Sequence, residues 1–302
     1  MPEVYRITPA LKDYLWGGQR LAEYGKGDGE RIAESWELSF TKGGEARIAD
    51  GRTLEEAFPR ESWGTACSGF EDFPVLTKFI DARENLSVQV HPSDEYALAK
   101  EGQYGKTEMW YVVDAKEGAG LYLGLKEKNS LQKVRDSALD GSIEQLLSFK
   151  EVRKGDVFFI PAGTIHAIGA GVLIYEIQQN STLTYRLYDY MRRDKDGNQR
   201  ELHLDKAVEV LNPDVYEPPT RAENNQCIIG KCKYFTARKY KQNFTNYPFF
   251  ANTESYLFIS VISGEGAIGA ESAKMGDSFF IPAGAGEITV NGDMELIVVS
   301  AV

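Results

Sequence analysis

The sequence predicts a mainly β protein that contains two like domains in tandem. Aromatic and β-branched residues recur in short runs between turn-forming residues, and the 302 residues include 16 Tyr, 15 Phe and 29 Gly, which favours many strands over a helical bundle. One stretch also occurs twice, as KGDVFFIPAGTIHAIGAG at 154–171 and as MGDSFFIPAGAGEITVNG at 275–292. Duplication of a strand and its turns indicates two domains of the same kind. Glu287 stands in the second copy where the first has His166.

Helical patterns are few at the start of the chain, and strands follow them. Residues 9–25 have a helical pattern interrupted by Gly17 and Gly18, and Thr53 with Glu56 three residues later is typical of a capping box. Strands are then predicted in FPVLTKFIDA (73–82), LSVQVHP (86–92), TEMWYVVDA (107–115) and DVFFIPAGTIHAIGAGVLIYEIQQ (156–179).

Two further segments set the predicted domain organisation. Residues 129–149 have the helical period and indicate an excursion between strands. A helical pattern at 204–211 is followed by residues 211–226, which are rich in Pro, Asn and charge and indicate a linker. We therefore expect one domain over residues 1–215, with the short helical insert, and a second over residues 216–302.

Composition excludes several classes of partner. The formal net charge is −11, and no stretch is dense in Lys or Arg, whereas a protein that binds nucleic acid needs a basic face. The three cysteines, Cys67, Cys227 and Cys232, fit neither a disulfide framework nor a zinc ribbon, so we expect them to be reduced. The sequence shows no signal peptide and no apolar run that could span a bilayer. We expect a cytoplasmic protein without nucleic-acid or membrane partners.

Two of the three histidines lie in settings that suit a metal. Residues two apart in a strand share a face, so Gln89 projects with His91, as Glu108 does with Trp110 on the next strand. His166 follows the first copy of the duplicated strand, and a Gln/His/Glu/His set can therefore converge inside a small barrel. Imidazole nitrogen and carboxylate oxygen are preferred zinc ligands, and an amide oxygen is a less usual one. The alternative is ordinary: a hydrogen-bonded core histidine and a glutamate at a strand end.

Six ordered blocks of the sequence resemble the short bacterial type I phosphomannose isomerases, which are zinc enzymes of the cupin superfamily. The blocks are LWGG, AESWELS, FPVLTKFIDARENLSVQVHPSDEYA, GKTEMWYV, IPAGTIHAIGAG and STLTYRLYDYMRRD. They run from about residue 8 to residue 195, and the rest of the chain is similar to the family's second, metal-free cupin. The resemblance implies two cupin-type (jelly-roll) barrels in tandem: a catalytic, metal-binding one in residues 1–215 and a metal-free one in residues 216–302.

The resemblance also implies roles for individual residues. The family's ligands for one Zn²⁺ per chain fall on Gln89, His91, Glu108 and His166. Its catalytic arginine, in a Tyr-Arg-x-Tyr-Asp motif, falls on Arg186, its proton-transfer lysine on Lys106, and a glutamate of its pocket on Glu176. Its phosphate contacts fall on Ser87 and on Arg192, a cation six residues after the arginine.

Each of these residues also has an ordinary interpretation. Arg186 is a candidate surface ion-pair partner of Asp189, which would contribute little. Arg192 lies in a charged turn where solvation is the default, and Lys106 follows Gly105 as an exposed loop residue would. His203 has no ligand-like neighbour in sequence, and we expect it to be structural.

The activity implied by the resemblance is interconversion of mannose 6-phosphate and fructose 6-phosphate. In such an aldose-ketose isomerisation a proton moves between C2 and C1 through a cis-enediol, and either Lys106 or Glu176 would serve as the base. Two alternatives belong to other classes: a metal-dependent cupin oxygenase and a non-catalytic sugar-phosphate-binding bicupin. Iron oxygenases usually show more histidines, and a sensor has little use for a base and an electrophile together. The sequence leaves the oligomeric state and the role of the C-terminal half open.

Overall fold

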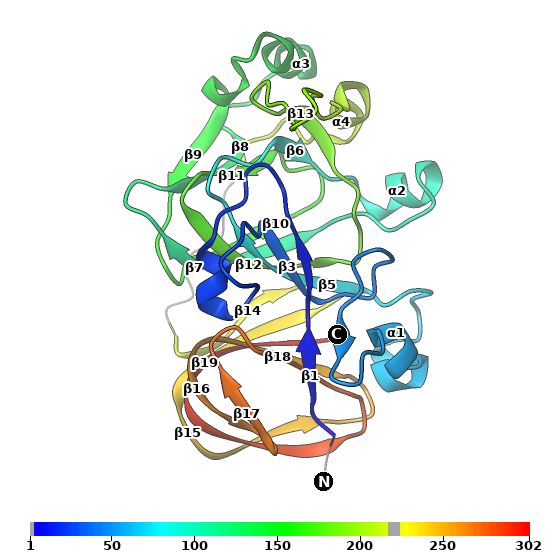
Figure 1. The fold of residues 1–302 in the computed structure, drawn as a ribbon. Coiled ribbons are helices and arrows are strands. Elements are labelled where there is room, and N and C mark those ends of the chain that lie inside the picture. The colour runs from blue at the N-terminus through cyan, green and yellow to red at the C-terminus, as the bar shows by residue number, and fades with distance from the viewer. Residues whose placement is uncertain (1–2, 217–223) are drawn as a thin grey trace. The chain divides into compact units, whose positions relative to one another are not determined.

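The computed structural model describes residues 3–216 and 224–302. The chain divides into two compact units (Figure 1). Unit 1 comprises Met1–Lys12, Gln19–Phe79 and Ala222–Val302, and unit 2 comprises Asp13–Gly18 and Ile80–Arg221. The compact units are therefore interleaved in sequence, whereas the predicted domains were contiguous. The division of roles between residues 1–215 and 216–302 stays a prediction.

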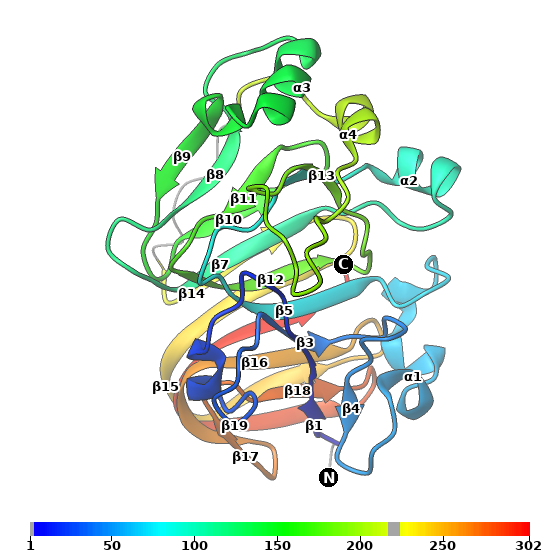
Figure 2. The ribbon, with the colours of Figure 1, turned by 45° about the horizontal axis from the view of Figure 1, so that its top comes forward.

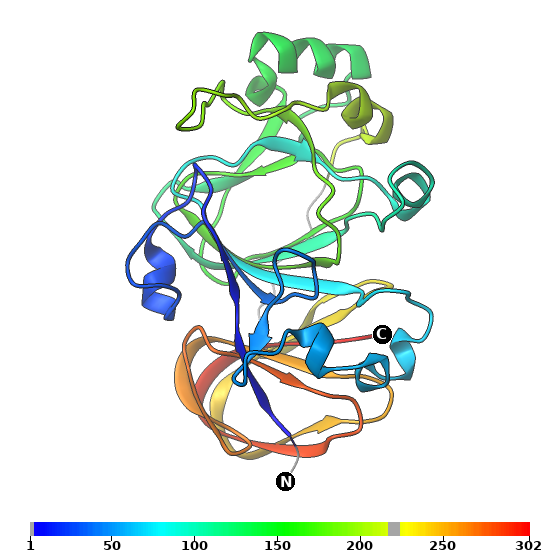
Figure 3. The ribbon, with the colours of Figure 1, turned by 45° about the vertical axis from the view of Figure 1, so that its right-hand side comes forward.

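Unit 2 is a barrel of antiparallel strands, which curve into a ring in Figure 3. One layer has the strand order β10-β7-β12 and the other the order β13-β6-β11-β8-β9. Helices α3 and α4 lie next to each other and contact β13 (Figure 2). The strands are β6 (Val88–Val90), β7 (Glu108–Ala115), β8 (Gly120–Leu125), β9 (Leu147–Glu151), β10 (Val157–Ile160), β11 (His166–Ile168), β12 (Val172–Gln179) and β13 (Tyr185–Tyr188). The helices are α2 (Asp94–Lys100), α3 (Leu131–Asp140), η4 (Ile143–Gln145) and α4 (Leu204–Val210).

Unit 1 contains a second barrel, made mainly of the C-terminal strands. Its sheet has the order β14-β15-β19-β16-β18-β1-β4, with β17 paired to β16. Apolar side chains from β15, β16, β18 and β19 form its core. The strands of unit 1 are β1 (Tyr5–Thr8), β2 (Ala10–Lys12), β3 (Glu34–Leu38), β4 (Arg47–Ile48), β14 (Gln226–Lys231), β15 (Thr236–Ala251), β16 (Leu257–Ile268), β17 (Glu271–Lys274), β18 (Ser278–Ile281) and β19 (Gly286–Ser300), with β5 (Val75–Asp81) ending in unit 2. Its helices are α1 (Leu54–Ala57), η1 (Arg20–Tyr24), η2 (Arg60–Trp63) and η3 (Thr65–Cys67).

The mainly β prediction is confirmed, and all four predicted strand segments contain strands. The predicted capping box is present at α1: the Thr53 hydroxyl accepts from the Glu56 amide, and the Glu56 carboxylate accepts from the Thr53 amide. The helix at 204–211 is also present, as α4. Of the predicted linker at 211–226, residues 217–223 lie outside the described part of the chain.

Two helical predictions need correction. The segment 9–25 forms strand β2 and the short helix η1, because residues 10–12 pair with residues 34–36 of β3. The excursion at 129–149 contains helix α3, which ends at Gly141 with its positive φ of 81°, and the short helix η4, but from Leu147 the chain forms strand β9. Long-range strand pairing overrides the local pattern at both places.

The duplicated sequence adopts the same local structure twice. Each copy begins with a glycine of positive φ, Gly155 at 90° and Gly276 at 89°, continues as a four-residue strand, and turns at Gly163 or Gly284, again with positive φ. Glycine suits these positions because it has no Cβ to clash in the left-handed region. The prediction that one strand-turn unit is repeated is confirmed.

Candidate metal centre

Three side chains from separate strands of unit 2 converge on one buried point. His91 directly follows β6, Glu108 begins β7 and His166 begins β11. One ligand atom from each lies within 4.8 Å of the others, and all three side chains are buried. A barrel of antiparallel strands produces this convergence because alternate side chains on each strand point inward.

Both imidazoles are held in the orientation that a metal ligand requires. The Nδ1 of His91 lies 2.7 Å from the Leu183 carbonyl oxygen, and the Nδ1 of His166 lies 2.9 Å from the Thr164 carbonyl oxygen. A carbonyl only accepts, so each Nδ1 carries the proton and each Nε2 presents a lone pair. The Nε2 atoms lie 3.6 Å and 3.1 Å from the Glu108 carboxylate.

The two Nε2 atoms and the Glu108 carboxylate form a set of electron-pair donors that a cation can bind. Burial, and then the positive charge of Lys106, lower the pKa of His91 well below its ordinary value, so that this ring is neutral. Burial would raise the pKa of Glu108, but the charge of Lys106, followed by interactions with the two histidines, outweighs it and holds the pKa well below its ordinary value. Two imidazole Nε2 atoms thus face an ionised carboxylate, a donor set that fits a divalent metal ion.

Gln89 and Lys106 complete the cluster. The Gln89 amide nitrogen lies 3.3 Å from the His166 Nε2, and the Ser87 hydroxyl lies 3.4 Å from the amide oxygen. The Lys106 Nζ lies 2.7 Å from the Glu108 carboxylate and 3.1 Å from the His91 Nε2. Lys106 is therefore a buried ion-pair partner of Glu108, and its interpretation as an exposed loop residue is wrong.

Glu176 stands one side chain away from the cluster. It lies on β12 opposite Trp110 of β7, and the Trp110 Nε1 donates to its carboxylate over 2.9 Å. The Trp110 ring meets the His166 ring edge-on, with centroids 5.3 Å apart. Glu176 is thus buried and connected to the ligands through Trp110 and is not among the ligand atoms themselves.

Arg186 lies beside Gln89 on the neighbouring strand. The two residues are opposite each other in the β13–β6 register. Burial, followed by the charge of Arg200, lowers the pKa of the Arg186 guanidinium from its ordinary value. Its Nε is buried and has no hydrogen-bond partner among the described residues. Its backbone is fixed by His203, whose Nδ1 accepts from the Arg186 amide over 3.3 Å and whose own amide donates to the Arg186 carbonyl over 2.8 Å. Arg186 therefore brings a cationic side chain next to Gln89 on the sheet, with a donor that no described residue uses.

Arg192 is held by an ion pair that sequence reasoning missed. Its guanidinium donates to the Asp189 carboxylate and, over 2.6 Å, to the Asn85 carbonyl. Arg200 donates to the same carboxylate over 2.7 Å and 2.5 Å. Asp189 thus pairs with Arg192 and Arg200, and its predicted pairing with Arg186 is not among the ion pairs of the described residues. No sequence pattern marked Arg200, which lies eleven residues from its partner in an irregular segment.

The second copy of the duplicated unit does not rebuild this centre. Glu287, the counterpart of His166, lies next to Phe250 on the neighbouring strand, and both side chains are exposed. The following residue, Ile288, points into the core of the unit 1 barrel. In the described residues the group of potential metal ligands is therefore confined to unit 2.

Comparisons with known proteins agree with this site. The family model for the catalytic domain of type I phosphomannose isomerase matches residues 4–119, and that for the cupin domain of mannose-6-phosphate isomerase matches residues 226–301. Mannose-6-phosphate isomerase ManA of Bacillus subtilis (strain 168) is 37% identical over 308 residues, with 97% of each chain covered.

Solved structures share the fold. A crystal structure of the mannose 6-phosphate isomerase from Bacillus subtilis superimposes with a TM-score of 0.84 at 35% identity, covering 98% of this chain and 99% of the other. A structure of mannose 6-phosphate isomerase bound with zinc and yttrium superimposes with a TM-score of 0.78 at 16% identity, covering 99% of each chain. The near-complete coverage and the two family models together show that this chain belongs to the family of type I phosphomannose isomerases, with a cupin-type fold.

Proposed function

We propose that this chain interconverts mannose 6-phosphate and fructose 6-phosphate, with one Zn²⁺ held by Gln89, His91, Glu108 and His166. The observation that carries the proposal is the pair of histidines whose Nδ1 protons are bound to backbone carbonyls and whose Nε2 lone pairs face Glu108. A bound Zn²⁺ supplies Lewis acidity that polarises a substrate oxygen. Zinc also agrees with the related structure that contains it.

Arg186 is proposed to stabilise the negative charge that develops on the substrate oxygen as the proton leaves carbon. Its position beside Gln89 and the unused donor at its Nε support this role. Arg186→Ala should keep zinc bound and lower turnover by about 10²–10³-fold. A variant that loses its metal, or that keeps near-normal turnover, would show that Arg186 does not have this role.

Lys106 is the better placed of the two candidate bases. Its Nζ touches the ligand cluster, whereas the Glu176 carboxylate accepts from Trp110 behind it. Deuterium at C2 of mannose 6-phosphate should exchange into water with the intact protein and with Glu176→Gln, and should stay in place with Lys106→Met. The reverse pattern would assign the proton transfer to Glu176.

Ser87 and Arg192 are proposed to bind the substrate phosphate and so to orient the sugar. Asp189 and the Asn85 carbonyl fix the Arg192 guanidinium, while the pairing with Asp189 also reduces the positive charge that it offers. Arg192→Gln should raise KM about tenfold or more and weaken inhibition by inorganic phosphate. Arg193→Gln is the matched control, because this neighbouring arginine is exposed and donates to the Gly197 carbonyl of an exposed turn.

The decisive experiment couples activity to metal. Fructose 6-phosphate is incubated with the protein before and after chelation, and mannose 6-phosphate is measured together with bound zinc. His166→Ala should lose both, whereas Glu287→Ala, a change at the duplicated position, should keep both. Activity that survives complete chelation, or metal analysis that finds iron, would contradict the proposal.

Two predictions about the setting of the protein remain. A cytoplasmic location is still proposed, and the three cysteines, which are free, are consistent with it. In the described residues, no helix combines the length and the apolar character needed to cross a membrane. Sugar phosphates are the proposed partners, and an oligomer stays an open expectation.

A further inference from the structure

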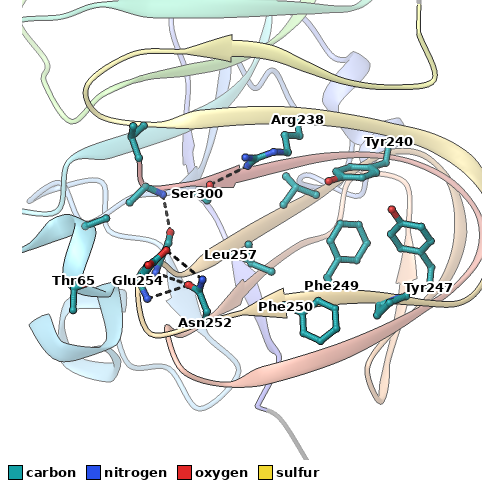
Figure 4. Close-up of a pocket in the computed structure, with 16 residues that line it drawn as sticks. Thr65, Arg238, Tyr240, Tyr247, Phe249, Phe250, Asn252, Glu254, Leu257 and Ser300 are labelled. Carbon is teal, nitrogen blue, oxygen red and sulfur yellow. Dashed lines mark hydrogen bonds between the residues drawn. The ribbon is translucent and has the colours of Figure 1, made fainter.

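Unit 1 contains a cavity to which the isomerase chemistry assigns no role. Its volume is about 590 Å³, within the range of small-molecule sites. Strand β15, the first residue of β16 and the end of β19 supply most of its wall. Figure 4 shows Arg238 and Tyr240 on one side of it, Phe249 and Phe250 on the other, and Leu257 between them.

The register of β15 explains why polar groups line this end of the barrel. Arg238 lies opposite Val298 and Tyr240 opposite Leu296 on β19. Val298 and Leu296 belong to the core cluster of the barrel, and residues directly opposite on antiparallel strands point to the same face. Arg238 and Tyr240 therefore extend the inward-facing row, at positions where the core gives way to the cavity.

Arg238 has hydrogen-bond capacity to spare. Its Nη1 donates to the Ser300 hydroxyl over 3.3 Å, and no carboxylate in residues 3–216 and 224–302 forms an ion pair with it. A half-buried guanidinium without a counter-charge favours an oxyanion, which it can bind through two parallel N–H groups.

The surroundings of Arg238 suit the same kind of ligand. Burial raises the pKa of Tyr240, so that its hydroxyl remains a donor at neutral pH. Glu254 is the one acidic side chain of the cavity lining, and it is exposed and lies beside Asn252, whose amide is 3.4 Å from its carboxylate. The negative charge of this side chain therefore sits at the solvent-facing edge, where water screens it.

Part of the remaining wall is apolar. Phe249 and Val298 are buried, Leu257 is half-buried and Phe250 is 61% exposed beside the cavity. Such a wall provides contact area for a compact body, and the arginine provides an anchor for one charged group. We propose that this cavity binds a small organic anion: a carboxylate or phosphate group at Arg238 and Tyr240, carried on a ring-sized body that packs on Phe249 and Leu257.

The test measures binding of defined probes to the full chain by calorimetry. Phenyl phosphate and benzoate combine a ring with an oxyanion, inorganic phosphate has the anion alone, and benzyl alcohol has the ring alone. We expect Arg238→Gln to weaken phenyl phosphate or benzoate at least tenfold and Tyr240→Phe to weaken it less. Binding of benzyl alcohol should be weaker and indifferent to both changes. The tighter of the two ring anions identifies the preferred charged group.

Arg52→Gln is the matched control, since Arg52 is an arginine of the same unit that lies outside the cavity and is 52% exposed. Binding of a phosphate ester at the metal centre of unit 2 is common to both variants and cancels in the comparison. Circular dichroism of Arg238→Gln should match that of the parent, so that lost binding is not lost fold. Equal affinities in Arg238→Gln and Arg52→Gln, or alcohol binding as tight as that of the anions, would overturn the proposal.

Discussion

At the scale of single residues, the site depends on the buried negative charge of Glu108, because Lys106 and both histidines face it. Glu108 faces the Nε2 atoms of His91 and His166 and pairs with Lys106, and it is fully buried. Removing the charge while keeping the shape leaves Lys106 without a counter-charge in a region of low polarity. The proposed metal would lose its one anionic ligand at the same time.

Glu108→Gln should therefore lower zinc affinity by at least about tenfold, as even changes behind the ligands do. Bound zinc is measured by elemental analysis after dialysis against a graded chelator. Glu117→Gln, in an exposed turn of the same unit, controls for the substitution itself. If the Glu108 variant holds zinc as tightly as this control, the carboxylate is not a ligand.

A second buried acid, Asp189, should make stability depend on pH. Burial would raise its pKa, but hydrogen bonds from Arg200 and Arg192 outweigh burial, so the pKa is lowered from the ordinary value of 3.8. Because the pKa of Asp189 is depressed in the folded state, its stabilising effect is fully present above the ordinary value of 3.8. The effect is lost as the pH falls through the folded-state pKa. Asp189→Asn should lower the free energy of unfolding by about 3 kcal/mol at pH 7, with a smaller difference near pH 3.5.

Urea unfolding at the two pH values measures this difference. Asp196→Asn, an exposed acid of the same loop, should change stability little at either pH. If Asp189→Asn lowers the free energy of unfolding equally at both pH values, the ionisation of Asp189 does not cause the effect.

Strand spacing predicted which side chains meet but not what holds them. The two-residue period places Gln89 and His91 on one face, and in the structure Gln89 lies beside His166 while His91 faces Glu108. The carbonyls of Leu183 and Thr164 that orient the rings could not be predicted, because any residue type supplies a carbonyl. Arg200 escaped for a similar reason, since its pairing with Asp189 depends on the path of an irregular segment.

At the scale of elements, the duplicated turn offers a natural comparison. Gly155 and Gly276 have nearly the same positive φ, at 90° and 89°. A Cβ at Gly155 would have only the Tyr111 hydroxyl nearby, at 3.9 Å, whereas a Cβ at Gly276 would lie 2.0 Å from the Tyr24 carbonyl oxygen. The same backbone strain is thus combined with a collision in one copy alone.

Gly155→Ala should lower the stability of the protein by about 1–2 kcal/mol through the left-handed conformation. Gly276→Ala should lower it distinctly more, because a backbone carbonyl cannot move aside cheaply. Thermal unfolding followed by circular dichroism compares the two variants. Equal losses would show that conformation, and not crowding, sets the requirement for glycine at both turns.

At the scale of elements, predictions were correct where the local sequence pattern was strong. They were wrong where pairing with a distant strand decided the structure. The strands around Gln89, Glu108 and His166 were predicted because apolar runs end in turn residues. Residues 10–12 form a strand because residues 34–36, which lie more than twenty residues further along the chain, pair with them. A local pattern cannot contain such information.

At the scale of the whole molecule, the repeat predicted two like domains but not how the chain is shared between them. Residues 5 and 6 of β1 pair with β18 near the C-terminus, so the N-terminal segment joins unit 1. The chemistry is divided unequally, because the metal-ligand group lies in unit 2 while the corresponding position of unit 1 carries an exposed Glu287. Unit 1 thus has the core of the fold without the ligand group of unit 2.

This division predicts where metal should stabilise the protein. A ligand that binds only the folded state adds about 2.7 kcal/mol at a free concentration one hundred times its Kd. Because every proposed zinc ligand lies in or beside β6, β7 and β11, zinc removal should speed amide hydrogen exchange in these strands while exchange in β16, β18 and β19 stays unchanged. Hydrogen-exchange mass spectrometry before and after chelation measures both regions in one sample.

The His166→Ala variant should resemble the chelated protein and should not respond to added zinc, whereas Glu287→Ala should respond as the parent does. If zinc removal speeds exchange throughout both units, or changes exchange in neither, the bound ion does not act through the cluster at His91, Glu108 and His166.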